Sequence, residues 1–298
     1  MNKNLKAHIS LLLANLIYGA NYSIAKFVMP QFVMPSAFIV LRVLSAIVLF
    51  WITSLFIPKQ KIDKQDYKLF VLCALFGIAI NQLLFFKGLS ITSPIHASIM
   101  MLCSPIIIIV ISTFLRSDNF TRQQFLGMFL SFVAAVFLVT SNQIASDKTA
   151  STFGDFCIFL NAISWGYYLV IVQRLMKKYH TITVMKWIFT IGLIFVFPFG
   201  YSDLKLVEWN LFTPKLWLAV LYVAVFVTYL AYIFNNYALK QLSPGIVGNY
   251  IYLQPILATL PALYFGTDSL NPFKIISAIT IVVGVYLVSN KRNAVVLK

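Results

Sequence analysis

The sequence predicts an all-α integral membrane protein of ten transmembrane helices, arranged as two inverted five-helix repeats. Of the 298 residues, 60% are hydrophobic and 10% are charged, whereas soluble domains contain about 45–50% apolar and about 25% charged residues. Long apolar runs follow one another along the chain, and one motif recurs at a spacing of 150 residues. The composition therefore excludes a soluble enzyme.

Ten apolar runs, separated by prolines, glycines and charged residues, are each predicted to cross the bilayer as a helix. About 20 apolar residues span the hydrocarbon core, and a helix satisfies its backbone hydrogen bonds within the segment. The first run continues to about Phe27 without a small-residue cleavage site, which favours a retained span over a signal peptide. The runs cover residues 7–27, 33–57, 68–89, 93–115, 123–141, 153–174, 182–201, 214–238, 243–265 and 271–290.

The Lys and Arg residues of the connections predict the orientation of the chain. With the N-terminus inside, 15 of these cations face the cytoplasm and 6 face the outside, as the positive-inside rule requires. The same rule explains the net charge of +15 without a nucleic-acid partner. We expect a bacterial inner membrane with both termini in the cytoplasm.

Residues 88–105 and 238–255 repeat one motif at the same offset. The matching pairs are Leu89 with Leu239, Ser93 with Ser243, Pro94 with Pro244 and Pro105 with Pro255. Five spans per half is an odd number, so the second half enters the membrane from the opposite side. The sequence therefore predicts an inverted-topology repeat, an architecture on which many secondary transporters are built. Its halves are residues 1–145 and residues 150–298.

The repeated motif combines a helix start with a proline in the middle of the span. A Ser before the first turn accepts from free backbone N–H groups, and Pro fits the first helical position. The predicted helix-start residues are Ser93, Pro94, Ser243 and Pro244. Pro105 and Pro255 each remove a backbone hydrogen bond further along the span. Such a site is either a packing kink or a gate.

Polar and aromatic residues inside the spans are the candidates for a substrate pathway. Several recur at helical spacing, and Tyr222, Tyr229, Tyr232 and Asn236 are predicted to share one side of span eight. Tyrosines near span ends also form interfacial belts, so Tyr18 and Tyr222 have a second interpretation. Besides Arg42, the predicted substrate-binding residues are Tyr18, Gln82, Asn161, Trp165, Tyr168, Tyr229, Tyr232, Asn236, Asn249 and Tyr252.

Arg42 is the sharpest single candidate. It lies about 12 Å along span two from the membrane surface, in a hydrocarbon core about 30 Å thick. No acidic residue is predicted at that depth, so a buried guanidinium there needs other partners. Two interpretations stay open: a guanidinium locked to carbonyls, which holds span two in place, or a cavity residue that binds a substrate carboxylate or phosphate.

Spans five and ten carry small residues instead of polar ones. Gly127, Ser131 and Ala135 form a small-residue ridge on span five, and Thr280 and Gly284 are spaced likewise on span ten. Such ridges permit close helix packing. We therefore expect these two spans to form a scaffold away from the pathway.

Short motifs along the whole chain resemble one known family. They are Tyr18-Gly19 and Trp165-Gly166, Leu41-Arg42 with Ala46, Gly88-Leu89 and Ala238-Leu239 before each Ser-Pro, and the mid-span Pro105 and Pro255. In this order they resemble the EamA-type ten-helix members of the drug/metabolite transporter superfamily, except that Tyr18 stands where that family more often has Trp. The resemblance implies alternating access, a central cavity lined by spans one to four and six to nine, and substrates such as amino acids, other small metabolites or drugs, often exported.

The function expected is therefore secondary transport of a small metabolite, an amino acid or related compound, outward. The three histidines are dispersed and all eight acids lie in connections or at span ends. We therefore expect no catalytic residue, metal or cofactor, and facilitated diffusion or exchange rather than carboxylate-driven proton antiport. The expected partners are the substrate and the lipid bilayer, in a monomer or weak homodimer. The alternatives are a structural or accessory membrane protein without transport activity and, less favoured, a membrane-embedded enzyme.

Overall fold

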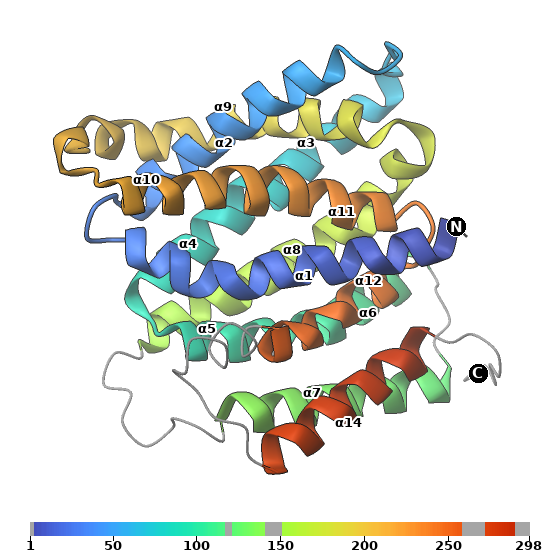
Figure 1. Cartoon of the computed structure of the whole chain (residues 1–298). Helices are drawn as coiled ribbons and strands as arrows, with labels where there is room; N and C mark the ends of the chain where they lie inside the picture. The colour runs from blue at the N-terminus through green and yellow to red at the C-terminus, as the bar shows by residue number, and fades with distance from the viewer. Residues whose placement is uncertain (1–2, 117–120, 141–150, 258–271, 290–298) are drawn as a thin grey trace.

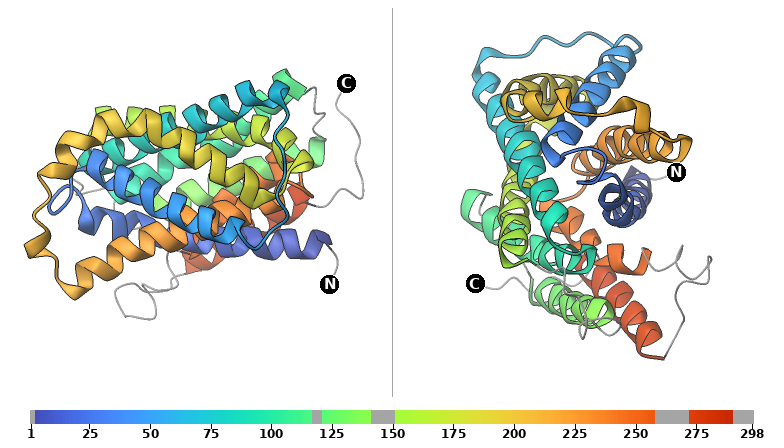
Figure 2. Two further views of the ribbon diagram at one scale, coloured as in Figure 1. Left: turned by 90° about the horizontal axis from the view of Figure 1, so that it is seen from above. Right: turned by 90° about the vertical axis from the view of Figure 1, so that its left-hand side faces the viewer.

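The computed structural model describes residues 3–116, 121–140, 151–257 and 272–289 (Figure 1), and the elements in these residues are helices. The helices lie side by side along one direction, as the two views in Figure 2 also show. In chain order they are α1 (Lys3–Val28), α2 (Pro35–Ser54), η1 (Lys64–Asp66), α3 (Tyr67–Ala74), η2 (Leu75–Ile80), α4 (Asn81–Ile91), α5 (Pro94–Met101), α6 (Ser104–Arg116), α7 (Arg122–Thr140), α8 (Thr152–Lys178), α9 (Thr181–Lys205), η3 (Trp209–Leu211), α10 (Pro214–Leu221), η4 (Tyr222–Leu230), α11 (Ala231–Ala238), α12 (Pro244–Asn249), η5 (Tyr250–Leu253) and α14 (Pro272–Ser289).

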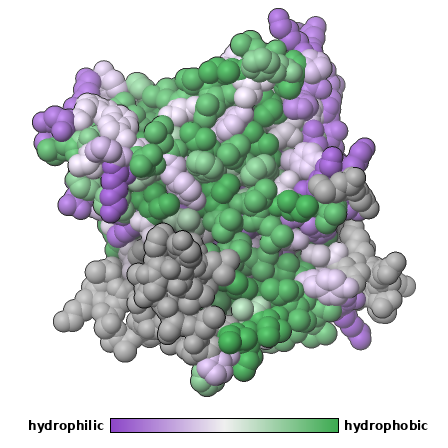
Figure 3. Space-filling model, viewed as in Figure 1, coloured by the Kyte–Doolittle hydropathy of each residue, from purple (hydrophilic) through white to green (hydrophobic). Residues whose placement is uncertain are grey.

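Eight helical stretches in the described residues are long and apolar enough to cross a membrane, and Ile275–Ser289 is a shorter apolar helix. Part of the predicted span 243–265, residues 258–265, lies outside the described residues. Hydrophobic side chains cover the middle of the molecular face drawn in Figure 3, and hydrophilic ones gather towards the two ends of the helices. The chain is therefore an integral membrane protein.

The two Ser-Pro motifs stand at helix starts, but only one serine acts as predicted. Pro94 and Pro244 are the first residues of α5 and α12. Ser93 Oγ accepts from the backbone N–H of His96 at 3.2 Å. The expected second cap is wrong, because Ser243 makes no side-chain cap hydrogen bond in the described structure. The extended backbone of the serine and the fixed φ of the proline suffice to begin α12 there.

The helix is interrupted just before each mid-span proline. Leu102 and Cys103 form a turn between α5 and α6, two residues before Pro105. In the second half, α12 gives way to the 3-10 helix η5, which ends two residues before Pro255. A proline cannot donate the backbone hydrogen bond that would continue the preceding turn, so both breaks lie where that bond is missing.

Two π-helical stretches also recur at matching places. Within the third and eighth predicted spans, η2 covers Leu75–Ile80 and η4 covers Tyr222–Leu230. Adding 150 to the numbers of η2 gives residues 225–230, which lie within η4. A π-helix places i→i+5 hydrogen bonds where the α-helix has i→i+4 bonds, so the register of side chains changes along both spans.

Helices from the two halves pack against each other in pairs. α1 packs on α11, α4 on α8, and α2 on α9. Lys178, the last residue of α8, pairs with Asp66 at the start of the α3–α4 stretch, Nζ to Oδ2 2.5 Å. Asp155 in the first turn of α8 accepts a hydrogen bond from Thr92 Oγ1, just after α4. Lys26 in the last turn of α1 donates to the backbone carbonyl of Thr92, so the end of α1 lies near the start of α8. α8 therefore runs antiparallel to α1.

α7 and α14 form a separate pair at one edge of the molecule (Figure 1). Gly127 and Gly284 face each other so closely that a Cβ on Gly127 would lie 2.7 Å from the Gly284 carbonyl oxygen. Ser131 Oγ donates to the carbonyl of Ile281 at 3.3 Å. The predicted close packing of spans five and ten is confirmed at Gly127, Ser131 and Gly284, whereas the hydroxyl of Thr280 donates to the carbonyl of Ile276 in its own helix.

Candidate functional site

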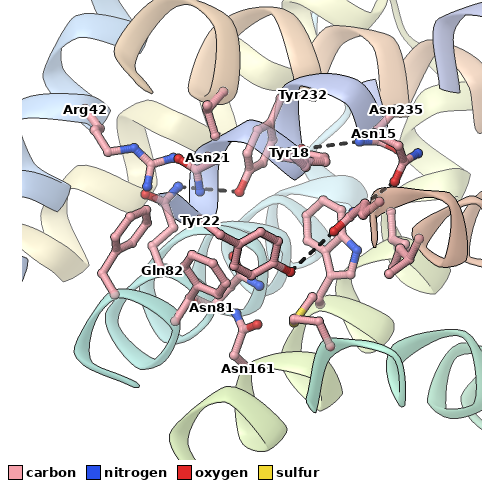
Figure 4. Close-up of a pocket in the computed structure, with 18 of the residues that line it drawn as sticks. Asn15, Tyr18, Asn21, Tyr22, Arg42, Asn81, Gln82, Asn161, Tyr232 and Asn235 are labelled. Atoms are coloured by element: carbon pink, nitrogen blue, oxygen red, sulfur yellow. Dashed lines mark hydrogen bonds between the residues drawn. The ribbon is translucent and has the colours of Figure 1, made fainter. Parts of the chain in front are cut away.

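A partly open cavity lies between the helices of both halves. It combines apolar walls with a few convergent polar groups, as ligand sites of proteins commonly do. Figure 4 shows its polar side chains converging from α1, α2, α4, α8 and α11. The lining residues are Asn15, Tyr18, Asn21, Tyr22, Arg42, Asn81, Gln82, Phe85, Phe86, Met101, Asn161, Trp165, Leu169, Val227, Tyr232, Asn235, Val247, Ile251 and Gln254.

Arg42 reaches this cavity from the middle of α2, and only 3% of its surface is exposed. Its Nε donates to Thr228 Oγ1 at 2.8 Å, and its Cζ lies 4.2 Å from the centre of the Phe86 ring. Its Nη1 has no hydrogen-bond partner among the described residues. The guanidinium is therefore fixed through its Nε, while its Nη1 is free to donate a hydrogen bond to a ligand.

The π-helical stretches supply the backbone groups that organise the cavity wall. A π-turn leaves carbonyl groups outside the ordinary i→i−4 pattern, and side chains of neighbouring helices bond carbonyls in and beside η2. Tyr232 OH donates to the carbonyl of Gly77 at 3.1 Å. Asn161 Nδ2 donates to the carbonyl of Asn81, just after η2, at 2.7 Å. In η4, Thr228 Oγ1 donates to the carbonyl of Val223, five residues earlier, at 2.8 Å.

Three buried amide oxygens of the cavity have no partner in the described part of the chain. They are Asn21 Oδ1, Gln82 Oε1 and Asn161 Oδ1. The nitrogens of Gln82 and Asn161 are engaged, with Tyr232 OH at 3.4 Å and with the Asn81 carbonyl, which leaves the oxygens as acceptors. A buried acceptor without a donor costs about 1–3 kcal/mol. A ligand that brings N–H groups would relieve this cost.

Aromatic rings and a hydrogen-bonded pair of amide side chains complete the wall of the cavity. Trp165 packs edge-on against Tyr232 with ring centres 5.8 Å apart, and Tyr22 packs likewise against Phe85 at 5.8 Å. Gln254 Nε2 donates to Asn15 Oδ1 at 2.9 Å, which ties α1 to the second half beside the cavity. The cavity thus combines one cation, amide groups and flat apolar surface.

Comparison with known proteins decides the family. The sequence pattern of the EamA-like transporter family matches residues 5–140 and again residues 152–290. The chain belongs to the EamA-like transporter family. The second match covers the second half of the chain, whose first helix is α8.

Relatives of this EamA-like transporter include proteins with transporter names. The "Uncharacterized transporter YyaM" of Bacillus subtilis (strain 168) is 26% identical over 96% of this chain and 94% of that protein. An "Uncharacterized transporter" of Archaeoglobus fulgidus is 26% identical over 74% of this chain and 75% of its own length. A WAT1-related protein of Arabidopsis thaliana is 22% identical over 95% and 85%. One crystal structure shares the fold, with a TM-score of 0.74 and 17% identity over 96% of this chain and 98% of the solved one.

The structure brings six of the predicted substrate-binding residues of this EamA-like transporter to one cavity. They come from spans one, two, three, six and eight, and both halves contribute. The six are Tyr18, Arg42, Gln82, Asn161, Trp165 and Tyr232. Residues far apart in the chain therefore converge on one site.

Five further predicted residues do not line this cavity. Tyr168 is fully buried and donates to Asn236 Oδ1 at 3.1 Å in the packing between α8 and α11. Tyr229 packs on the ring of Phe50, with ring centres 4.7 Å apart. Asn249 and Tyr252 are buried away from the cavity lining, and within the described residues Tyr252 OH and both amide atoms of Asn249 lack hydrogen-bond partners.

The predicted common face on span eight is wrong because η4 interrupts the α-helical register. Tyr222 OH donates to the carbonyl of Ile17 at 2.9 Å, while Tyr232 reaches the cavity. Asn235, next to the predicted Asn236, lines the cavity and donates to Tyr18 OH at 3.3 Å. A spacing of 3.6 residues per turn does not carry through a π-helix.

Sequence reasoning missed several polar lining residues. They are Asn15, Asn21, Tyr22, Asn81, Asn235 and Gln254. Asn15 and Asn21 are spaced with Tyr18 on span one, which is a signal that could have placed them. Gln254 lies directly before Pro255, and its orientation follows from the 3-10 turn that precedes it, which the sequence pattern does not predict.

Proposed function

We propose that this EamA-like transporter is a secondary transporter that moves a small metabolite, an amino acid or related compound, outward by alternating access. The observation that carries the proposal is the uncommitted Arg42 Nη1 in a cavity that also holds buried acceptor oxygens without donors. A guanidinium binds carboxylate groups well. Amide oxygens accept from an ammonium or amide group. An amino acid offers both partners at once.

The packing of the helices supports ten spans in two inverted repeats. Exchanging the halves turns the α1–α11 contact into the α8–α4 contact and leaves the α2–α9 and α7–α14 contacts unchanged. α1 and α8, the first helices of the two family matches, run antiparallel. This arrangement supports the proposed inverted-topology repeat, in which the halves rock against each other around a central site.

The breaks before Pro105 and Pro255 support a gating role for these prolines. Met101 ends α5 and Ile251 lies in η5, and both line the cavity. A helix interrupted beside a cavity bends there at low cost. In this proposal the two breaks let the ends of spans four and nine move as the cavity changes the side to which it opens.

Orientation and environment follow from the loop charges. In the proposed ten-span arrangement 15 loop cations lie on one side and 6 on the other, and the positive-inside rule then favours both termini in the cytoplasm. We propose a bacterial inner membrane, a monomer or weak homodimer, and transport by facilitated diffusion or exchange. Tyr22, Phe85 and Trp165 favour a substrate with a planar or apolar portion.

Arg42 variants in proteoliposomes test the function. Screening the purified protein by thermal shift against amino acids, nucleosides and organic acids identifies the substrate. Arg42→Lys keeps the charge but loses the fork geometry, so the apparent KM should rise about tenfold while Tm stays near wild type. Arg42→Gln should lose nearly all transport of an anionic or zwitterionic substrate.

Lys186→Gln is the matched control, because Lys186 Nζ lies 4.4 Å from the centre of the Trp51 ring and outside the cavity lining. It removes a cation from a span, and transport should persist. The proposal is wrong if both Arg42 variants melt early while their surviving fraction keeps a normal KM, because Arg42 would then only hold α2 in place.

A further inference from the structure

A lysine stands in the seam between α2 and α9, two helices that pack side by side at one edge of the bundle (Figure 1). Lys186 lies in the second turn of α9 and is half-buried. Beside the seam, Trp51 on α2 is 40% exposed and Ile194 on α9 is 68% exposed. In an integral membrane protein such a face meets lipid, so the ammonium of Lys186 lies at the lipid-facing surface and outside the cavity lining.

This ammonium has fewer hydrogen-bond partners than it can use. A lysine Nζ carries three N–H donors. Among the described residues Lys186 Nζ donates to Ser54 Oγ, at 3.4 Å, and no carboxylate pairs with it. Lys26, near the end of α1, instead donates to three backbone carbonyls at 2.8, 2.9 and 2.9 Å. Lys186 therefore keeps donors for a partner outside the protein.

Two tryptophans hold the ammonium in place. Lys186 Nζ lies 4.4 Å from the centre of the Trp51 ring and 5.8 Å from that of the Trp187 ring. The two indoles pack edge-on with ring centres 5.8 Å apart. Trp51 Nε1 donates to Thr190 Oγ1 at 3.1 Å, which ties the indole to α9. The ring faces attract the cation, but they do not neutralise its charge.

The depth of Lys186 matches that of lipid headgroups. It lies five positions after Thr181, the first residue of α9, which is about 8 Å along the helix axis. The headgroup layer on each side of the hydrocarbon core is about 5–8 Å thick. Its partner Ser54 is the last residue of α2, and tryptophans are enriched at this level of membranes. A fixed cation without a counterion thus faces the layer that contains phosphates.

We propose that Lys186, Trp51 and Ser54 form a binding site for the phosphate of an anionic phospholipid. Phosphate oxygens accept from the remaining N–H donors of Lys186 in charge-assisted bonds, and the acyl chains lie along exposed apolar side chains of the seam such as Ile194. A zwitterionic choline lipid binds less well, because its own cation would come close to the lysine ammonium. This site is independent of the proposed transport function.

Tryptophan fluorescence tests the site in the full chain, in micelles of a neutral detergent, because two indoles stand beside the ammonium. Dihexanoyl phosphatidylglycerol should change the fluorescence with an apparent Kd about fivefold lower than that of dihexanoyl phosphatidylcholine, the effect of one lysine near an anionic surface. Lys186→Gln should abolish this preference, and Lys186→Arg, which keeps the charge, should retain it. Inorganic phosphate should give no comparable change, because it brings no acyl chains to the seam.

Lys205→Gln is the matched control. Lys205 is exposed at the other end of α9, and its Nζ lies 4.2 Å from the centre of the Tyr201 ring. Its replacement should leave the lipid preference as in the wild type. The proposal is overturned if the wild type binds both lipids equally, or if Lys186→Gln keeps the preference. An equal response to inorganic phosphate would overturn the lipid as the source of the phosphate. These titrations contain no substrate, so their outcome is separate from that of the Arg42 variants.

Discussion

At the scale of single residues, Thr228 decides how Arg42 is presented. Its Oγ1 accepts from Arg42 Nε at 2.8 Å and donates to the carbonyl of Val223 at 2.8 Å. One hydroxyl therefore satisfies a guanidinium N–H and a backbone carbonyl of η4. In the proposed function Thr228 is a positioning residue, because it contacts Arg42 and does not itself line the cavity.

Replacing Thr228 should weaken substrate binding more than it lowers stability. Thr228→Val removes the oxygen but keeps the shape, so Arg42 Nε loses its acceptor, and we expect a loss in affinity of about tenfold. Thr228→Ser keeps the hydroxyl and should bind almost as the wild type does. Titration calorimetry with the identified substrate measures both.

Thr113→Val serves as the control for this pair of variants. Thr113 is exposed on α6, and its hydroxyl donates to the carbonyl of Ile109 in its own helix. Its replacement should change neither affinity nor Tm noticeably. An unchanged affinity for Thr228→Val together with a much lower Tm would show that the hydroxyl only stabilises η4.

At the scale of elements, η2 packs against α8 without room for a side chain at Gly77. A Cβ at this position would overlap the ring of Tyr168, with Tyr168 Cε2 at 2.6 Å. Tyr168 is fully buried and bonded to Asn236, so its ring has little freedom to move. This close approach brings the Gly77 carbonyl to Tyr232 and positions the cavity wall.

Gly77→Ala should therefore destabilise the protein. Inserting a methyl group into a packed interface costs about 1–3 kcal/mol, and Tm in detergent should fall by several degrees. In Gly166→Ala the new methyl would lie 3.2 Å from the Ile107 side chain, which is a milder contact, and Tm should fall less. Equal Tm values for the two variants would contradict the close approach of η2 and α8.

At the scale of the whole molecule, equivalent contacts occur at opposite ends of the helices. Lys26 donates to the carbonyls of Leu89, Ser90 and Thr92 at the end of α4. Gln173 Nε2 donates to the carbonyls of Leu239 and Leu242 just after α11. Leu239 and Leu242 lie 150 positions after Leu89 and Thr92. The equivalent contact is thus charged in one half and neutral in the other.

Reporter fusions test the proposed orientation. A fusion after Asn290 and one in the 59–67 connection should report the cytoplasm, because their cations favour that side. A fusion in the 142–152 connection should report the outside. Alkaline phosphatase and green fluorescent protein fusions give opposite signals and control for expression. The same side for the 59–67 and 142–152 fusions would contradict the ten-span inverted arrangement.

The sequence alone determined that the chain is an all-helical membrane protein, pointed to its family and predicted part of the cavity lining. Apolar runs of span length form helices in lipid because each backbone group must be bonded within its segment, and the repeated Ser-Pro motif marks two helix starts. Six of the eleven predicted binding residues, Arg42 among them, line the cavity, because polar side chains inside a span favour an interior position.

Only the tertiary structure decided which side chains meet. Periodicity predicts a face as long as the helix keeps 3.6 residues per turn, and η4 breaks that register between Tyr222 and Tyr232. Within α11, Asn235 and Asn236 are both spaced with Tyr232, and helix packing decided that Asn235 lines the cavity. The pairing of His96 with Asp155 joins two helix starts from different halves, and no local pattern contains it. Contacts between distant segments depend on how the helices pack, which local sequence spacing does not encode.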